Sequence, residues 1–183
     1  SGIGTFFERT NRSTLARDAA DICIVSFGDT ARVVCDFGPL EKAMSQVSRE
    51  PIRAIGSQTV LAAGVNLALD RLDAHLAELA AVNNNAYVPW LIIISDGDST
   101  EPAAQVEQAA ARVQDMLRTR RLKTMCLNMG EGSRSLNAFA ENGSVGRLEN
   151  LKVVDFFEML SRSVSETSKQ VIENGGPDFS AQN

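Results

Sequence analysis

The chain has 183 residues and a mass of 19.7 kDa, which favours a single domain with a short tail. Hydrophobic residues make up 44% and charged residues 22%, the composition of a globular protein rather than of a disordered or fibrous one. The net charge of −5 and the pI near 5.0 argue against a nucleic-acid-binding surface, which needs clustered positive charge. The longest apolar run, residues 88–95, contains Pro89 and is much shorter than the roughly 18 residues of a membrane-spanning helix. We therefore expect a cytoplasmic protein that binds neither nucleic acid nor membranes.

The histidine and cysteine counts narrow the chemistry further. His75 is the only histidine, which argues against His-based catalysis and His-ligated zinc, and its place on the polar flank of a predicted helix favours an exposed side chain. The three cysteines lie in or beside apolar segments, so we expect free thiols in a reducing compartment. They are Cys23, Cys35 and Cys126.

The first half of the chain predicts a β-hairpin between helices. Two β-rich runs, residues 21–27 and 32–37, are joined by a short turn that contains Gly and Asp. From Thr59 to the Asn run near residue 83, apolar residues recur every three or four positions, which is one face of a long amphipathic helix. Shorter helices are predicted over residues 3–16 and 40–48.

The second half predicts strands that alternate with helices. The continuous apolar run over residues 88–95 is typical of a central strand buried on both faces. Ser99 or Thr100 is expected to cap the next helix, with Glu101 and Pro102 in its first turn. The remaining predicted elements are a strand over 123–129, a helix over 133–141, a strand over 151–154 and a helix capped by Asp155.

This order of elements predicts a doubly wound α/β fold with a mostly parallel sheet and one antiparallel edge hairpin. Such folds normally open on a strand, whereas this chain opens on a predicted helix. We therefore expect a domain over residues 1–172 that lacks its first strand, followed by a flexible tail over 173–183. Another polypeptide segment is expected to fill the gap in the sheet.

Open α/β sheets bind ligands beyond the carboxyl ends of their strands. Two polar segments are candidates for such a site, one directly after a predicted strand and one directly before a predicted helix. Asp96 comes directly after the most apolar strand, and Gly97 is expected to let the backbone turn sharply there. Thr59 precedes the long helix, where its hydroxyl either caps the helix or binds a ligand. A carboxylate and hydroxyls suit a hard cation such as Mg²⁺. Asp98 is expected to be a solvated loop acid.

Three segments together resemble a von Willebrand factor type A (VWA) domain. They are ICIVSFGDTARVV, GSQTVLAAGVNLAL and VPWLIIISDGDST, and the resemblance runs from residue 3 to about residue 170. Within that family the chain most resembles the bacterial tellurite-resistance TerY-like group. The resemblance implies a metal-ion-dependent adhesion site, built from a D-x-S-x-S loop, a Thr before a helix and an Asp in a T/S-D-G triplet. Thr59 and Asp96 match the last two, and the D-x-S-x-S loop has no counterpart here.

The function that this resemblance implies is binding rather than catalysis. Thr59 and Asp96 would help to hold Mg²⁺ or Mn²⁺, with the D-x-S-x-S ligands supplied from outside these residues. An Asp or Glu from a partner protein would complete the coordination of the metal. The TerY-like group implies a cytoplasmic role in stress response or tellurite resistance.

Two alternatives stay open. Asp96, Asp98 and Thr100 match the D-x-D-x-T motif of the haloacid dehalogenase-like phosphotransferases, in which the first Asp attacks phosphorus and the second acts as general acid and base with Mg²⁺. That motif normally lies on the first strand, whereas here a hairpin and helices precede it. The other alternative is a VWA scaffold that binds partners without metal.

Overall fold

The computed structural model describes residues 20–50, 56–82, 87–130 and 134–147. The predicted helices over 3–16 and after Asp155, the strand over 151–154 and the tail over 173–183 lie outside the described residues.

The predicted hairpin is present. Strands β1 (Ile24–Phe27) and β2 (Ala31–Cys35) pair antiparallel, with Phe27 opposite Ala31. Helix α3 (Leu40–Arg49) follows and packs against β2, with Leu40 and Ala43 buried beside Cys35. The predicted short helix over residues 40–48 is therefore confirmed.

The other strands form a parallel sheet in the order β3–β4–β5. Strand β3 (Trp90–Ser95) pairs with β4 (Lys123–Asn128), and β4 pairs with β5 (Val145–Arg147). The sequence did not predict β5, because its three residues include Gly146 and carry too little apolar periodicity to mark a strand.

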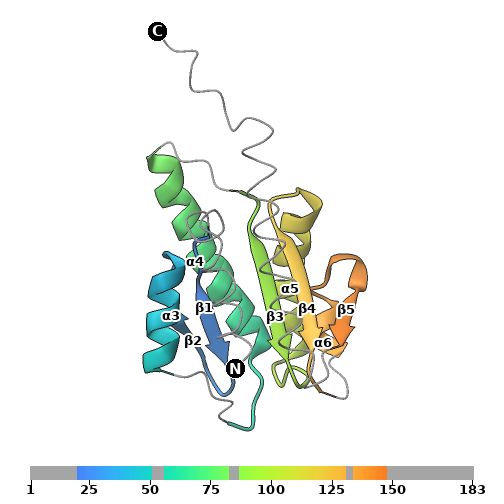
Figure 1. The fold of residues 1–183 in the computed structure, drawn as a ribbon. Coiled ribbons are helices and arrows are strands. Elements are labelled where there is room, and N and C mark those ends of the chain that lie inside the picture. Colours follow the sequence, from blue (N-terminus) through green and yellow to red (C-terminus); the bar gives the residue numbers. More distant parts are fainter. Residues whose placement is uncertain (1–19, 51–55, 83–86, 131–133, 148–183) are drawn as a thin grey trace.

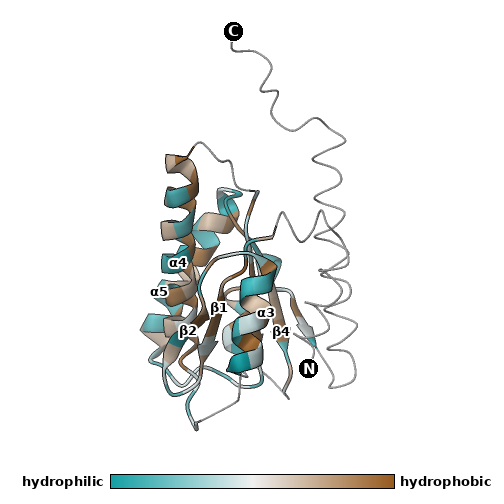
Figure 2. Cartoon of the chain, turned by 60° about the vertical axis from the view of Figure 1, so that its left-hand side comes forward, coloured by the Kyte–Doolittle hydropathy of each residue, from teal (hydrophilic) through white to brown (hydrophobic). Residues whose placement is uncertain are grey.

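Helices cover both faces of the strands (Figures 1 and 2). Helices α4 (Leu61–Ala81) and α5 (Ala103–Arg118) lie on one side, and α3 lies on the other. Arg112 of α5 holds these two helices together by donating to the carboxylates of Asp70 and Asp73 on α4. The predicted doubly wound α/β fold with one antiparallel hairpin is thereby confirmed.

One hydrophobic core joins the two sheets. Buried side chains of α4 pack with those of α5, β3 and β4, and Phe27 of β1 packs against the same cluster. Its most buried members include Leu61, Leu69, Val113 and Phe139. Because α4 contacts β1 and β2 and also packs on α5, it fixes the hairpin relative to the parallel sheet.

Strand β3 is less buried than its sequence predicts. Only Ile93 and Ser95 are buried, and Trp90 is 40% exposed. Within the described part of the chain, β3 is hydrogen-bonded only to β4 and β1 only to β2, so the two sheets are not joined by a strand. A central strand is covered most fully when it has a neighbour along each edge, which accounts for the difference.

The helix predicted over 133–141 is also shorter than expected. Helix α6 spans Arg134–Asn137, and a 3₁₀ turn follows over Glu141–Gly143, where Asn142 adopts a positive φ of 56°. Across the described ranges, no helix is both long enough and apolar enough to cross a membrane.

Candidate functional site

Thr59 and Asp96 lie on neighbouring loops at one end of the strands. Thr59 is half-buried just before α4, and Asp96 is exposed directly after β3. A Cβ atom placed on Gly97 would lie 3.7 Å from the Thr59 hydroxyl oxygen, so this hydroxyl is next to the residue that follows Asp96. The described residues donate no hydrogen bond to the Asp96 carboxylate. The loops that carry Thr59 and Asp96 are therefore adjacent, and both side chains carry oxygen atoms of a kind that binds cations.

The two loops are held together by hydrogen bonds to the backbone of Thr59. The Thr100 amide donates to the Thr59 carbonyl over 3.0 Å, and the Thr59 amide donates to the Thr100 hydroxyl over 3.0 Å. The Ser99 hydroxyl also donates to the Thr59 carbonyl over 3.2 Å. The N-cap of α4 is Val60, without a side-chain hydrogen bond, so the Thr59 hydroxyl is not used to cap the helix.

Glu101 occupies an unexpected place. The prediction that it lies in the first turn of the next helix is wrong, because α5 begins at Ala103 with Pro102 as its N-cap. Neither Ser99 nor Thr100 caps that helix. The Glu101 carboxylate instead accepts from the amides of Ala62 and Ala63 at the start of α4. Proline at the N-cap, with its fixed φ and no N–H, sets the start of α5 without a side-chain cap.

Asp29, in the turn of the hairpin, was not singled out by the sequence. Its Oδ1 atom accepts from the amides of Ser57 and Gln58, each over 2.9 Å. Gly56 has a φ of +109°, and a Cβ there would overlap the Asp29 carboxylate. Asp29 therefore fixes the loop that leads into Thr59. An Asp in a tight turn gives no sequence signal for so distant a contact.

Asp98 is exposed, as predicted, but it is also bound. Its Oδ1 accepts from the Ser135 amide over 2.9 Å and from the Ser135 hydroxyl over 3.2 Å. These hydrogen bonds, led by the one from the backbone amide, lower the pKa of the Asp98 carboxyl below its usual range. The ionised Asp98 thus attaches the start of α6 to the loop after β3.

The glycine that this region requires is Gly130 rather than Gly97. The φ of Gly97 is not positive and a Cβ there would make only an ordinary contact with the Thr59 hydroxyl, so the expected sharp turn does not depend on glycine there. A Cβ on Gly130 would overlap the Asp96 carbonyl oxygen, because the segment after β4 passes directly against the segment after β3. The Met129 amide donates to the Ser95 carbonyl over 2.9 Å at the same point.

The oxygen ligands at Thr59 and Asp96 are of the right kind for a hard cation, but they are too few to hold one. A carboxylate and a hydroxyl are ligands that Mg²⁺ and Mn²⁺ accept. Among the residues that the structure describes, no group of three or more His, Cys, Asp or Glu side chains could hold a metal ion. Asp96 and Thr59 therefore fit part of a coordination shell that needs further ligands.

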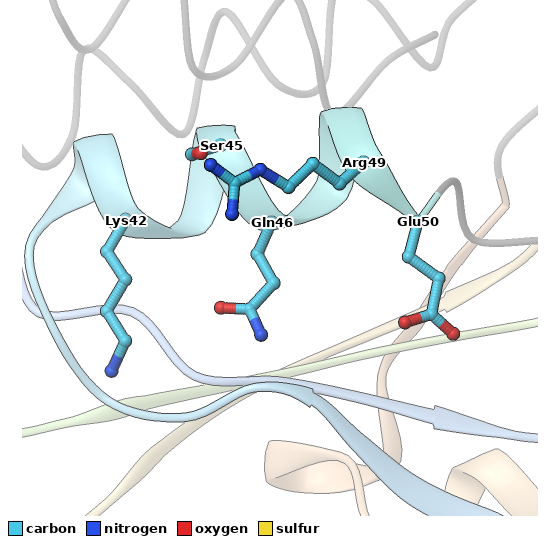
Figure 3. A pocket seen from close by; sticks show the side chains of 5 residues that line it. All are labelled: Lys42, Ser45, Gln46, Arg49 and Glu50. Carbon is cyan, nitrogen blue, oxygen red and sulfur yellow. The ribbon is translucent and has the colours of Figure 1, made fainter.

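The remaining polar features offer weaker candidates. A pocket on α3 is lined by Lys42, Ser45, Gln46, Arg49 and Glu50 (Figure 3). All five come from one helix and its C-cap residue, and none belongs to the loops of Thr59 and Asp96. Lys42 already donates to the carbonyls of Asp36 and Phe37, and Glu50 pairs with Arg32. The pocket therefore lacks converging groups that could act on a ligand.

The environments of Cys23, Cys126 and His75 indicate roles in packing rather than in chemistry. Burial raises the pKa of Cys126 to about 12 and that of Cys23 to about 11, which keeps both thiols protonated and poorly nucleophilic. The prediction that His75 is exposed is wrong, since its side chain is only 16% exposed. Its ring stacks on Phe37, and its Nε2 atom lies 3.0 Å from Oδ2 of Asp21. The position of His75 on the polar flank of the helix gave no sign of the stacking on Phe37.

Comparisons with known proteins show the fold. No protein-family model matches the chain, and no curated protein matches it. Among solved structures, proximal thread matrix protein 1 from the mussel byssus matches with a TM-score of 0.61 and 14% identity over 87% of this chain. The VWA domain of SpRpn10 matches with a TM-score of 0.56 and 11% identity, over 84% of this chain and 77% of that one.

These likenesses establish a VWA-like fold for the chain. The chain spans 41% of the mussel protein's length, so it corresponds to a part of that protein. Identities of 11% and 14% show the architecture alone.

Proposed function

We propose that this domain binds a partner protein through a metal ion held at the loops of Thr59 and Asp96. The observation that supports the proposal is that the loop of the exposed Asp96 lies against the loop of Thr59, at the carboxyl end of β3 in a VWA-like fold. A bound Mg²⁺ or Mn²⁺ would supply an open coordination position for an Asp or Glu of the partner. No bond is made or broken, so the domain acts as a binding module rather than as an enzyme.

The residues around the site would orient it and set its specificity. Asp29 fixes the loop before Thr59, and Asp98 fixes the loop after Asp96 through Ser135. These contacts restrain the backbone on either side of Thr59 and Asp96. Restraint of this kind lowers the entropy lost when a partner binds.

The remaining ligands are proposed to come from a strand and its D-x-S-x-S loop supplied from outside these 183 residues, as the resemblance to VWA domains implies. β1 and β3 both end at the loops around the start of α4, as shown by the hydrogen bonds of Val60 to Gly28 and of Thr100 to Thr59. They therefore run in the same direction (Figure 1), and a parallel strand between them would deliver its following loop to Asp96.

A cytoplasmic role in stress response or tellurite resistance, as in the TerY-like group, is the setting that we propose.

Thermal melting of the full chain in increasing Mg²⁺ or Mn²⁺ tests the metal-dependent proposal. A metal bound only by the folded state raises the melting temperature as its concentration passes the dissociation constant. We expect a rise for the wild type, abolished by EDTA and by Asp96→Ala and reduced by Thr59→Val. Glu41→Ala serves as the control, because Glu41 is an exposed carboxylate on α3. A flat response of a cooperatively folding wild type would contradict metal binding and leave the metal-free scaffold.

The phosphotransferase alternative makes a different prediction for the same variants. Hydrolysis of p-nitrophenyl phosphate that needs Mg²⁺ and disappears in Asp96→Asn would favour it over the binding module. The absence of hydrolysis by a chain that binds Mg²⁺ would count against it.

A further inference from the structure

The carboxylate of Glu101, in the loop after β3, accepts hydrogen bonds from backbone amides at the N-terminus of α4. The Ala62 amide lies 2.6 Å from Oε2 of Glu101, and the Ala63 amide lies 2.9 Å from Oε1. These amides belong to the first turn of α4, where backbone N–H groups have no acceptor within the helix. The positive end of the helix dipole also favours a negative charge at this point. Both oxygens of Glu101 are thus engaged by the protein itself.

Ser99 connects this carboxylate to Thr59. The Ser99 hydroxyl lies 2.9 Å from Oε2 of Glu101 and 3.2 Å from the Thr59 carbonyl oxygen, and it also accepts from the Glu101 amide over 3.2 Å. Thr100, between them, exchanges two hydrogen bonds with the backbone of Thr59. The residues Ser99, Thr100 and Glu101 therefore bind both ends of the segment from Thr59 to Ala63.

We propose that Glu101 is a positioning residue of the candidate site. Its carboxylate locks the loop that carries Asp96 onto the loop that carries Thr59, so that the two ligand side chains are presented together. Glu101 itself does not reach the ligand, because both its oxygens are bound to α4. Its importance for metal binding rests on the proposed function, whereas its effect on the two loops does not.

Amide hydrogen exchange of the full chain, followed by NMR, tests the lock without any ligand. In Glu101→Ala we expect the amides of Ala62 and Ala63 to exchange about tenfold faster or more, since hydrogen bonds to a charged acceptor are lost. The amides of Thr59 and Thr100 should also exchange faster, because the loops separate. Glu101→Gln keeps one carbonyl oxygen and should restore part of the protection.

Two controls separate this effect from general destabilisation. Leu69, in the middle of α4, should keep its exchange rate, and Glu107→Gln, an exposed position on α5, should change none of these amides. Unchanged rates at Thr59 and Thr100 in Glu101→Ala, with faster exchange at Ala62 and Ala63, would overturn the proposal. Glu101 would then only cap the helix.

A second readout connects the lock to metal binding. If Mn²⁺ raises the melting temperature of the wild type, Glu101→Ala should need about tenfold more Mn²⁺ for the same rise above its own metal-free melting temperature, because the loss of one such contact shifts the loops away from the binding arrangement. Equal Mn²⁺ requirements would overturn the positioning role. If Mn²⁺ has no effect on the wild type, the proposed function fails, and the exchange rates at Thr59 and Thr100 still decide whether Glu101 locks the loops.

Discussion

At the scale of single residues, the candidate site depends on contacts between backbone segments that come from different loops. Gly130 lets the segment after β4 lie against the Asp96 carbonyl, and Asp29 and Glu101 bind amides before and within the first turn of α4. None of these three residues would itself touch a ligand. They decide where Thr59 and Asp96 lie, so substitutions at these positions should change the site without removing a ligand.

Gly130→Ala is expected to destabilise the fold. The added methyl group would overlap the Asp96 carbonyl oxygen, and backbone cannot move away as a flexible side chain can. We expect a loss of about 1–3 kcal/mol, the usual cost of overpacking, measured by urea unfolding. Gly97→Ala is the matched control, because its methyl group would meet only the Thr59 hydroxyl at an ordinary contact distance. Equal stabilities of the two variants would contradict the close approach at Gly130.

At the scale of elements, β3 combines the sequence of a central strand with a strand partner on one side only among the residues that the structure describes. The carbonyls of Pro89 and Ser95 accept from amides at the two ends of β4. Since successive residues of a strand direct their N–H and C=O groups to alternate sides, Leu91 and Ile93 also face β4. Ile92 and Ile94 therefore direct their amides to the opposite edge, toward the side of β1.

The exchange rates of the Ile92 and Ile94 amides test the proposed strand between β1 and β3. If such a strand is present in the full chain, both amides should exchange as slowly as that of Ile93, which is protected by β4 in either case. Hydrogen exchange followed by NMR measures this directly. Fast exchange at Ile92 and Ile94 alongside a protected Ile93 would show an uncovered edge and count against the strand.

The sequence predicted most elements because their apolar periodicity is long and regular. The 21 residues of α4 are of this kind, whereas β3 was predicted from a continuous apolar run. It did not predict β5 or the true length of α6, which are too short for periodicity to mark. The contacts of Glu101, Asp29 and Gly130 were also beyond it, because each joins residues that only the tertiary fold brings together.

At the scale of the whole molecule, one helix organises both the core and the candidate site. Buried residues of α4 pack with both sheets, and its N-terminus receives the loops from β1 and β3. The pair Thr59 and Asp96 could be named from the sequence, because each stands at an end of a strongly marked element. Their proximity follows from α4 and β3 meeting at the same end of the fold (Figure 1).

The most direct test of the account is to locate bound Mn²⁺ by its paramagnetic broadening of amide signals in the full chain. We predict that the signals of Thr59 and Gly97 broaden first, while those of Trp90 and Val82, at the far ends of β3 and α4, stay sharp. The same titration of Asp96→Ala should leave all four signals sharp. Selective broadening elsewhere, or none in the folded wild type, would contradict a metal site at Thr59 and Asp96.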